Sequence, residues 1–275
     1  MEAGNKVVIA DKQSGTDVDL PGVAEALFAK EKPDAVFHLA GPINLRKSPA
    51  DALFVKDLDF LSRTARLLDA CKKYHVKKIV FVSSGGAVYE EAAVIPTPED
   101  YLVHPQSLYG LANLMVEKHL QLYGGNHGLP VTIVRLSNVY GPRQWESGFI
   151  PAMIIKMLQK EVPIMHGTGR QTRDFIYIDD VVEALTVLAG RGGSEIYNIG
   201  SGRETSLNDI FDMIKNILGL EITAIHGQPR AFAFEVPRSA VAIKKMKKTF
   251  GWAPTTSLKA GLKKTIAYYK NAKPE

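Results

Sequence analysis

Short apolar runs alternate along this chain with longer stretches in which apolar and charged residues recur at helical spacing. An uninterrupted apolar run predicts a strand buried on both faces, whereas an apolar stripe repeating every three or four residues predicts an amphipathic helix. The runs typical of strands are KVVIA (6–10), AVFHLA (35–40), KKIVFVSS (77–84) and VTIVRLS (131–137). The helical stretches are residues 23–32, 51–73 and 108–123. This alternation predicts an α/β fold with a doubly wound parallel sheet.

The pattern changes after about residue 140. Pro142, Gly148 and Pro151 interrupt the alternation, and FIYIDDVVEALTVLA (175–189) then returns to a strand followed by a helix. Further helices are expected over residues 150–160, 206–219 and 257–270. We therefore expect a small C-terminal α/β lobe that caps the sheet. The expected boundaries are 1–145, with about 174–200, for the sheet domain, and 146–173 with 201–275 for the lobe.

Composition narrows the class of protein. The chain has 275 residues, of which 45% are hydrophobic, and no apolar run approaches the roughly 18 residues that cross a bilayer. The first residues are too charged, and their apolar stretch too short, for a secretory signal, so a cytoplasmic location is expected. The single cysteine, Cys71, cannot form an internal disulfide, and its helical surroundings predict packing in the core.

The net charge of +5 suits an anionic small ligand and also weak contact with nucleic acid. The densest basic run, Lys244, Lys245, Lys247 and Lys248, has no aromatic residues interleaved with it. We therefore interpret it as a solvated helix face and expect no nucleic-acid partner. The histidines show no metal-ligand spacing, so no metal site is expected.

Seven segments occur in an order and at spacings that point to one family. They are AVFHLAG, FVSSGGAVYE, SLYGLANLMVEKHL, RLSNVYGPRQ, GTGRQTRDFIYIDDVVEAL, YNIGSG and TFGWAPTTSLKAGLKKTI. Together they resemble the extended short-chain dehydrogenase/reductases, and most of all the UDP-glucose 4-epimerases and related nucleotide-sugar epimerases and dehydratases. The resemblance covers nearly the whole chain. It implies a Rossmann-like sheet, NAD as cofactor, a UDP-linked nucleotide sugar as substrate, and a homodimer.

The resemblance also implies a catalytic group. In the family, NAD takes a hydride from C4 of the sugar and returns it to the other face. A tyrosine acts as acid and base at the C4 hydroxyl, and a serine or threonine hydrogen-bonds that hydroxyl. Carried over, Tyr109 in LYGLAN is the tyrosine and Ser84 the hydroxyl residue, with Ser83 as a less favoured alternative and Gly85 as another possible alignment.

One catalytic position departs from the family pattern. The family's lysine, four residues beyond the tyrosine, lowers the tyrosine pKa with its charge. Here that position is Asn113, on the same helix face as Tyr109, and Lys118 is too far along the helix to replace it. A neutral amide cannot stabilise tyrosinate by charge. The lost charge is worth about 1–4 kcal/mol in a partly buried site, which corresponds to a rate lower by about 10- to 1000-fold.

The second departure is at the N-terminus. Family members begin with a strand, a GxxGxxG loop and a helix, whose glycines let the backbone approach the pyrophosphate. No GxxGxxG occurs here, and MEAGNKVVIAD resembles the end of that helix followed by the second strand, which predicts an N-terminally truncated sheet. The glycines at 84–86 and 200–202 do not follow a first strand and open a helix. Without the central first strand, we expect residues 6–10 to pair beside 35–40 or with another chain.

The remaining cofactor contacts also come from the resemblance. Asp11 corresponds to the acid at the adenosine ribose and Asp17 to the acid near the adenine, although either could be an ordinary turn or capping residue. Leu39, Ala40 and Gly41, in the LAG segment, together with Ser83, correspond to further positions at the cofactor.

The substrate side follows the family more closely. Asn138 corresponds to a contact with the sugar-nucleotide diphosphate, and Arg173 to an arginine that binds phosphate. A surface ion pair of Arg173 with Asp174 or Asp179 is the alternative. Glu235 and Arg238 resemble the uridine and phosphate end. The usual Arg-Pro-Gly before that glutamate reads Phe-Ala-Phe at 232–234, which leaves uridine specificity open.

Three interpretations stay open. The first is an epimerase or dehydratase, active as written or once an N-terminus lost through a misassigned start codon is restored; such an error explains the absent loop but not Asn113. The second is a non-catalytic protein that binds a nucleotide sugar or a partner chain. The third is a decaying gene product. For the homodimer, Leu111, Leu114 and Met115 are either interface contacts or core residues.

Overall fold

The structure is a computed structural model. It describes residues 4, 6–13, 15–18, 20–41, 54–90, 92–146, 148–228 and 236–271, without the side chains of residues 54–58. Of the residues predicted to form the site, Glu235 lies outside the described residues.

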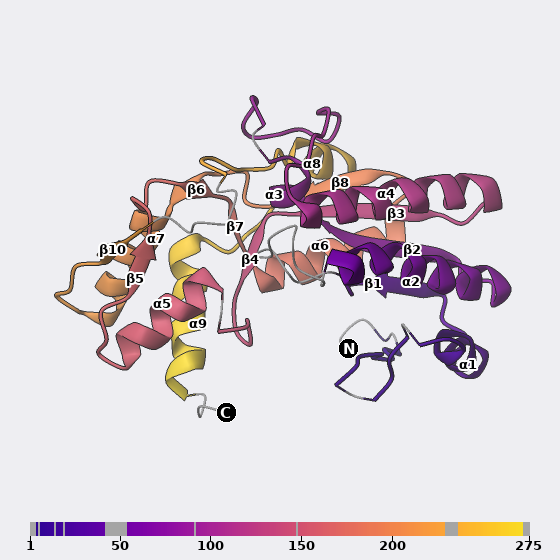
Figure 1. Cartoon of the computed structure of the whole chain (residues 1–275), viewed down its shortest axis with the longest axis horizontal. Coiled ribbons are helices and arrows are strands. Elements are labelled where there is room, and N and C mark those ends of the chain that lie inside the picture. Colours follow the sequence, from indigo (N-terminus) through magenta and orange to yellow (C-terminus); the bar gives the residue numbers. More distant parts are fainter. Residues whose placement is uncertain are drawn as a thin grey trace.

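A parallel sheet forms the centre of the larger part of the molecule (Figure 1). In the described part of the chain it has the strand order β1-β2-β3-β8. The strands are β1 (Ala35–His38), β2 (Lys78–Ser84), β3 (Val131–Leu136) and β8 (Ile196–Ile199). All neighbouring pairs run parallel, so every carboxyl end lies at one edge of the sheet. The predicted α/β fold with a parallel sheet is confirmed.

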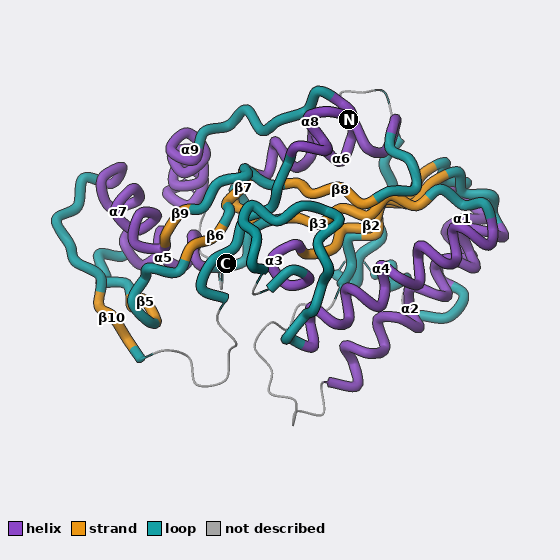
Figure 2. The backbone as a smooth tube through the Cα atoms, turned by 90° about the horizontal axis from the view of Figure 1, so that it is seen from above, coloured by secondary structure: helices purple, strands orange, loops and turns teal. Residues whose placement is uncertain are grey.

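Helices cover both faces of this sheet (Figure 2). One face carries α1 (Val23–Glu31), α2 (Phe54–Lys73) and α4 (Leu108–His127), and the other carries α6 (Ile178–Arg191) and α8 (Lys244–Phe250). Successive strand residues point to opposite faces. Phe81 therefore packs in the cluster beneath α2 and α4, whereas Val80 packs in the cluster beneath α6. This two-sided burial is why β2 reads as a continuous apolar run.

A second group of elements packs around a hydrophobic core of its own, which includes Tyr140, Ile154, Phe211 and Leu262. The elements of this second group are β4 (Asn138–Tyr140), α5 (Phe149–Leu158), β5 (Ile164–His166), β6 (Thr172–Arg173), β7 (Phe175–Tyr177), β9 (Thr205–Ser206), α7 (Leu207–Leu218), β10 (Ile225–Gly227) and α9 (Leu258–Asn271). The remaining short helix, α3 (Gly85–Val88), follows β2 directly and lies against α4. Strands β4 and β7, and likewise β5 and β10, pair in parallel, and β6 pairs with β9 antiparallel. Helices α5, α7 and α9 lie at the end of the molecule away from α1 (Figure 1).

The predicted strand at residues 6–10 is wrong. This segment has no strand structure and does not pair with β1, and Val7 and Ile9 are 62% and 75% exposed. A β-branched run becomes a strand only where it finds hydrogen-bond partners and a face to bury. Segment 6–10 has neither, so the expected pairing beside 35–40 does not occur. Strand β1 is consequently an edge of the sheet, and Phe37 on it is 43% exposed.

Two simpler predictions are confirmed. Cys71, on α2, is fully buried in the hydrophobic core. Burial raises the pKa of its thiol to about 12, so the residue is an unreactive packing residue. The basic run forms α8, which buries Met246 and exposes Lys244, Lys247 and Lys248. None of the helices in the described ranges is long and apolar enough to cross a bilayer.

Candidate active site

A cleft of about 280 Å³ opens at the carboxyl ends of β1, β2 and β3. Its lining residues are Leu39, Gly41, Val82, Ser83, Ser84, Tyr109, Asn113, Leu136, Ser137 and Val139. In parallel α/β sheets, this edge is where ligands bind. The cleft therefore brings together six of the residues predicted from the sequence: Leu39, Gly41, Ser83, Ser84, Tyr109 and Asn113.

The N-terminal turn of α4 positions Tyr109. The Ser107 hydroxyl accepts a hydrogen bond from the Gly110 amide at 3.0 Å, which caps the helix just before Tyr109. Gly110 lies against α3, because a Cβ there would stand 2.3 Å from the Ala87 carbonyl oxygen. Any larger residue would push α4 away from the end of β2. The cap and the glycine thus set the Tyr109 side chain beside Ser84.

The environment of Tyr109 favours its neutral form. Burial raises the pKa of the phenol above its ordinary value of 10, and hydrogen bonds from the side chains of Ser84 and Asn113 counter that rise only in part. At neutral pH the phenol therefore keeps its proton. It can donate or accept a hydrogen bond, but it is a weak base.

Asn113 lies where the lysine was expected from the sequence. Its side chain is 3% exposed, and its amide nitrogen donates to the Tyr109 main-chain carbonyl at 2.8 Å. No lysine or arginine is among the described residues that line the cleft. The phenol thus has hydrogen-bonding neighbours, and no positively charged side chain lies beside it among the described residues that line the cleft.

Ser83 does not present a free hydroxyl to the cleft. Its Oγ donates to Glu117 Oε1 at 2.5 Å, and Glu117 is fully buried on the same face of α4 as Tyr109 and Asn113. Arg135 of β3 donates to the same carboxylate, at 2.7 Å from Nη2 and 3.1 Å from Nε. The buried ion pair therefore links β3 to α4, and the Ser83 hydrogen bond links β2 to the same carboxylate.

The network continues through Arg135 to two further elements. Arg135 Nη1 donates to the Tyr89 hydroxyl at 3.0 Å, and that hydroxyl donates to Asn198 Oδ1 at 2.8 Å. The guanidinium also lies over the Tyr89 ring, 4.9 Å from its centroid. Sequence reasoning missed Glu117 and Arg135. A charge inside the apolar run VTIVRL, and a glutamate eight residues beyond the tyrosine, were the available signals.

On the substrate side, Asn138 and Arg173 lie on β4 and β6 and do not line the cleft. Asn138 is exposed, and its main-chain N–H donates a hydrogen bond to the Asp174 main-chain carbonyl at 2.8 Å. Arg173 Nη1 donates to the Thr172 and Val236 carbonyls at 2.8 and 2.6 Å. These contacts orient the guanidinium toward the segment that leads to Arg238.

Arg238 forms a two-point ion pair with Glu204. Its Nε and Nη2 donate to the two carboxylate oxygens at 2.9 and 2.5 Å, and Arg238 lowers the pKa of the Glu204 carboxyl. Thr172 also donates to Glu204. Sequence reasoning did not foresee Glu204. An anionic ligand at Arg238 has to compete with this carboxylate.

Asp11 and Asp17 lie in the N-terminal segment and do not line the cleft. Asp11 Oδ1 accepts the Gln13 amide at 2.7 Å, as in a turn, and Asp17 pairs with Lys12 at 3.8 Å. Ala40 is exposed between Leu39 and Gly41 but is not among the cleft residues either.

The glycines at 84–86 and 200–202 lie in tightly packed turns and do not form a phosphate-binding loop. The amides of Ser201, Gly202 and Val241 donate to the buried Asp174 carboxylate at 2.7, 3.1 and 3.3 Å, so a side chain already fills this turn. At Gly85, a Cβ would stand 2.8 Å from Val241 Cγ1, so that glycine allows close packing.

A whole NAD molecule does not fit the described residues. The cleft that Tyr109 and Ser84 line has a volume of about 280 Å³, which is enough for only part of a dinucleotide. The pyrophosphate needs a cradle of free backbone amides at a helix N-terminus, and the sequence contains no GxxGxxG to build one. The two glycine turns that could have replaced it are filled or close-packed.

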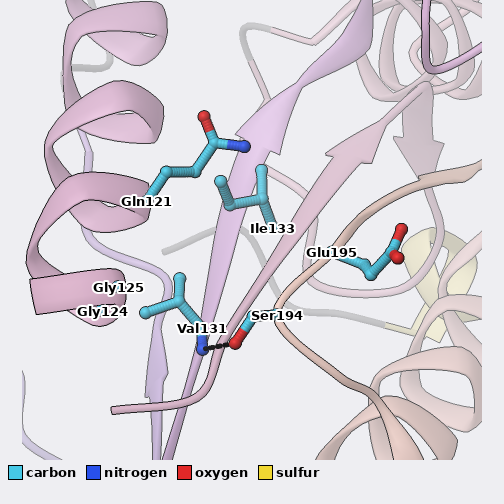
Figure 3. Close-up of a pocket in the computed structure, with 7 residues that line it drawn as sticks. All are labelled: Gln121, Gly124, Gly125, Val131, Ile133, Ser194 and Glu195. Atoms are coloured by element: carbon cyan, nitrogen blue, oxygen red, sulfur yellow. Dashed lines mark hydrogen bonds between the residues drawn. The ribbon is translucent and has the colours of Figure 1, made fainter. Parts of the chain in front are cut away.

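A second cavity, of about 200 Å³, lies at the opposite edge of the sheet (Figure 3). Val131, the first residue of β3, lines it together with Gln121 of α4 and Ser194, whose Oγ accepts the Val131 amide at 3.3 Å. Because this edge holds the amino ends of the strands, the cavity faces away from Tyr109. It is not a candidate for the same chemistry.

The fold agrees with comparisons with known proteins. Residues 2–200 match the sequence model of the NAD dependent epimerase/dehydratase family, and the chain belongs to that family. It is similar to a putative UDP-glucose 4-epimerase of Methanocaldococcus jannaschii, with 39% identity over 98% of this chain and 88% of the relative. It is also similar to UDP-glucose 4-epimerase of Mycolicibacterium smegmatis, with 32% identity over 93% of this chain and 80% of the relative.

Solved structures give the same result. The UDP-glucose 4-epimerase of Thermotoga maritima, solved with UDP-glucose, superposes with a TM-score of 0.87 at 35% identity, over 92% of this chain and 82% of that one. The Thermus thermophilus UDP-glucose 4-epimerase, solved with NAD, gives a TM-score of 0.84 at 27% identity, over 93% of this chain and 84% of that one. The fold is therefore that of the Rossmann-like epimerases and dehydratases, whose cofactor is NAD.

Proposed function

We propose that this chain is a nucleotide-sugar epimerase- or dehydratase-like protein that binds a UDP-linked hexose with its C4 hydroxyl at Tyr109 and Ser84. The meeting of Tyr109, Ser84 and Asn113 in one cleft is the observation that carries the proposal. A phenol and a hydroxyl that share a cleft can hold one sugar hydroxyl between them.

The same cluster makes the activity weak. Proton transfer needs a base whose pKa lies near the working pH, and burial moves the pKa of Tyr109 in the opposite direction. Asn113 adds a hydrogen bond but no charge, so the phenol keeps its proton.

The choice of a UDP-linked sugar rests on the relatives and on charge. The Thermotoga maritima structure contains UDP-glucose, and several other similar structures also contain UDP-sugars. In this chain, Arg173 precedes Asp174, whose carbonyl accepts the Asn138 amide, and Arg238 follows Pro237, whose carbonyl accepts the Thr172 amide. We propose that the diphosphate binds beside these two arginines and Asn138. Glu235 is proposed as the uridine contact on the sequence alone. Asp11 and Asp17 are kept as proposed contacts for the adenosine half of NAD.

A second candidate is a nucleotide-sugar binder without catalysis. The neutral Asn113 favours it, because a neutral amide at this position removes the positive charge that the reaction uses beside the tyrosine. The binding site for the sugar is the same in both candidates. Only turnover distinguishes them.

The deciding experiment measures turnover and cofactor on one purified sample. We would incubate the protein with UDP-glucose and added NAD, quantify UDP-galactose and 4-keto sugar, and assay the denatured protein for released dinucleotide. Slow product formation supports the impaired enzyme. Binding of UDP-glucose with neither product nor dinucleotide supports the binder, and failure to bind UDP-glucose or UDP rejects both candidates.

We also propose a homodimer through α2 and α4. Leu111 on α4 is 41% exposed, and Leu114 and Met115 are partly buried beside it. Light scattering of the wild type and of Leu111→Glu tests this: we expect a dimer that the charged variant dissociates. A monomeric wild type would reject the proposal.

A further inference from the structure

Trp145 presents most of its side chain to solvent, in the loop that joins β4 to α5 (Figure 1). It is 69% exposed, whereas Trp252, the only other tryptophan of the chain, is 4% exposed and packs in the core beneath α6. A tryptophan side chain carries a large apolar surface and is highly buried on average. An indole as exposed as that of Trp145 is therefore a candidate contact for a ligand.

Hydrogen bonds on both sides of Trp145 fix the path of its backbone. In the preceding residue, Gln144, the side-chain amide donates to the Val139 carbonyl at 3.0 Å, and the main-chain carbonyl accepts the Tyr269 hydroxyl of α9. The Trp145 carbonyl itself accepts the Gly148 amide at 2.9 Å, at the start of α5. The exposure of the indole therefore follows from a defined loop conformation.

The residue two positions before Trp145 supports the same view. Arg143 has a φ of 63°, in the left-handed region that side chains other than glycine rarely adopt. Strained backbone of this kind persists only where the surroundings enforce it, and it is concentrated at ligand-binding sites. Here the contacts of Gln144, the next residue, enforce it. The loop thus keeps a strained turn directly before the exposed indole.

This loop is attached to the wall of the cleft. Val139, whose carbonyl accepts the Gln144 side chain, lines the cleft together with Tyr109. Trp145 is thus separated from the wall by one glutamine side chain and one peptide unit. The residue before Val139 is Asn138, beside which we propose that the diphosphate binds. The indole therefore lies within reach of a ligand that extends out of the cleft past Asn138.

The size of the cleft makes such an extension necessary. Its volume of about 280 Å³ is enough for only part of a nucleotide sugar. With the hexose at Tyr109 and the diphosphate beside Asn138, the base has to lie outside the cleft. The flat face of an indole stacks on the flat face of a base, whichever base it is. Trp145 offers such a face next to the position at which the ligand leaves the cleft.

We propose that Trp145 binds the base of the nucleotide sugar by stacking on it. This inference rests on the proposed function. Stacking holds a base without reading the hydrogen-bonding groups along its edge. It therefore agrees with the sequence at 232–234, where Phe-Ala-Phe replaces the Arg-Pro-Gly that is usual in the family before the uridine contact.

The test is a calorimetric titration of the full chain with UDP-glucose, UDP and inorganic pyrophosphate, for the wild type and for Trp145→Ala. In Trp145→Ala we expect the affinities for UDP-glucose and for UDP to fall by the same factor, about 5- to 150-fold, the range for the loss of one stacked base. The affinity for pyrophosphate, which has no base, should stay unchanged. The melting temperature of the unliganded variant should equal that of the wild type, because the indole is mostly exposed.

Tryptophan emission gives a second readout. UDP should quench the emission of the wild type, because uracil covers the exposed indole of Trp145. In Trp145→Phe the quench should disappear, since the remaining Trp252 is buried away from the ligand. The phenylalanine ring can still stack, so UDP affinity should fall less in Trp145→Phe than in Trp145→Ala.

Leu122→Ala is the matched control, because Leu122 is also 69% exposed but lies on α4, thirteen positions beyond Tyr109, and it should change none of these affinities. Unchanged UDP affinity in Trp145→Ala would overturn the inference and leave the proposed function standing. A loss for UDP-glucose but not for UDP would assign the indole to the hexose, and an equal loss for pyrophosphate would show a general disturbance of the site; each would also overturn it. If the wild type binds neither UDP nor UDP-glucose, the inference and the proposed function both fall.

Discussion

The side-chain amide of Asn113 donates a hydrogen bond to the main-chain carbonyl of Tyr109, 2.8 Å away and one helical turn earlier. The amide that occupies the lysine position of the family is thus partly engaged by the helix itself. It cannot supply the positive charge that brings a tyrosine toward its ionised form. This relationship is the basis of our proposal that the fold of an active family here carries a site of reduced reactivity.

Restoring the charge should restore reactivity. In Asn113→Lys, an ammonium next to the phenol lowers the pKa of Tyr109, and turnover of UDP-glucose with added NAD should rise by about 10- to 1000-fold. In wild type, turnover should still be rising at pH 9, because the pKa of Tyr109 lies above 10. The variant should reach its plateau at lower pH. A pH–rate profile from pH 6 to 10 measures both effects.

Asn113→Met controls for side-chain length without charge, and its pH profile should follow that of wild type. An equal gain in Asn113→Met would show that shape rather than charge limits the reaction. A wild-type profile already flat at pH 7 would contradict the assignment of a raised pKa to Tyr109.

The Glu117–Arg135 pair should be a main support of the folded state. Glu117→Gln leaves the Arg135 guanidinium buried without its counter-charge, and the free energy of unfolding should fall by about 3–5 kcal/mol. The free energy of unfolding lost in the double variant Glu117→Leu/Arg135→Met should be much less than the sum of the losses in Glu117→Leu and in Arg135→Met. Urea unfolding of wild type, these two single variants and the double variant measures the coupling. Additive losses would contradict a direct pair.

Asp174 should hold the turn at 200–202 through both of its oxygens. Oδ1 accepts from the Ser201 amide and hydroxyl, and Oδ2 from the Gly202 and Val241 amides. Asn at this position keeps only one acceptor oxygen, so at least one buried amide loses its partner. Asp174→Asn should therefore lower the free energy of unfolding by about 1–3 kcal/mol. Amide exchange at Gly202 and Val241 should quicken; unchanged exchange would contradict this role.

Glu204 should weaken anion binding by occupying Arg238. The pair is largely exposed on the arginine side, and such pairs contribute at most about 1 kcal/mol. Glu204→Gln should therefore strengthen UDP binding by up to about fivefold, the fold-change that this energy allows. Glu195→Gln, which breaks the Lys245 pair elsewhere, is the matched control. Weaker UDP binding in Glu204→Gln would show that Glu204 assists the ligand instead.

The sequence predicted the fold well where a hydrophobic pattern is typical of a single type of secondary structure. The apolar run predicted β2 and the helical spacing predicted α4, whereas the resemblance to the family is what assigned Ser84 and Tyr109 to one site. Residues 6–10 misled, because an apolar run carries no information on whether a partner strand is present. Glu117 and Arg135 were missed because their partnership joins residues 18 apart in sequence across a helix and a strand. The buried Ser137 oxygen, which has no hydrogen-bond partner among the described residues, could be found only from the coordinates.

The most direct test of the account is a calorimetric comparison of UDP-glucose and UDP binding to wild type and to Tyr109→Phe. The account predicts that wild type binds both, and that loss of the phenol hydroxyl weakens UDP-glucose by about 3- to 10-fold while UDP is unaffected. Equal affinities of wild type and Tyr109→Phe for UDP-glucose, or no binding of UDP-glucose to wild type, would contradict the placement of a sugar at Tyr109.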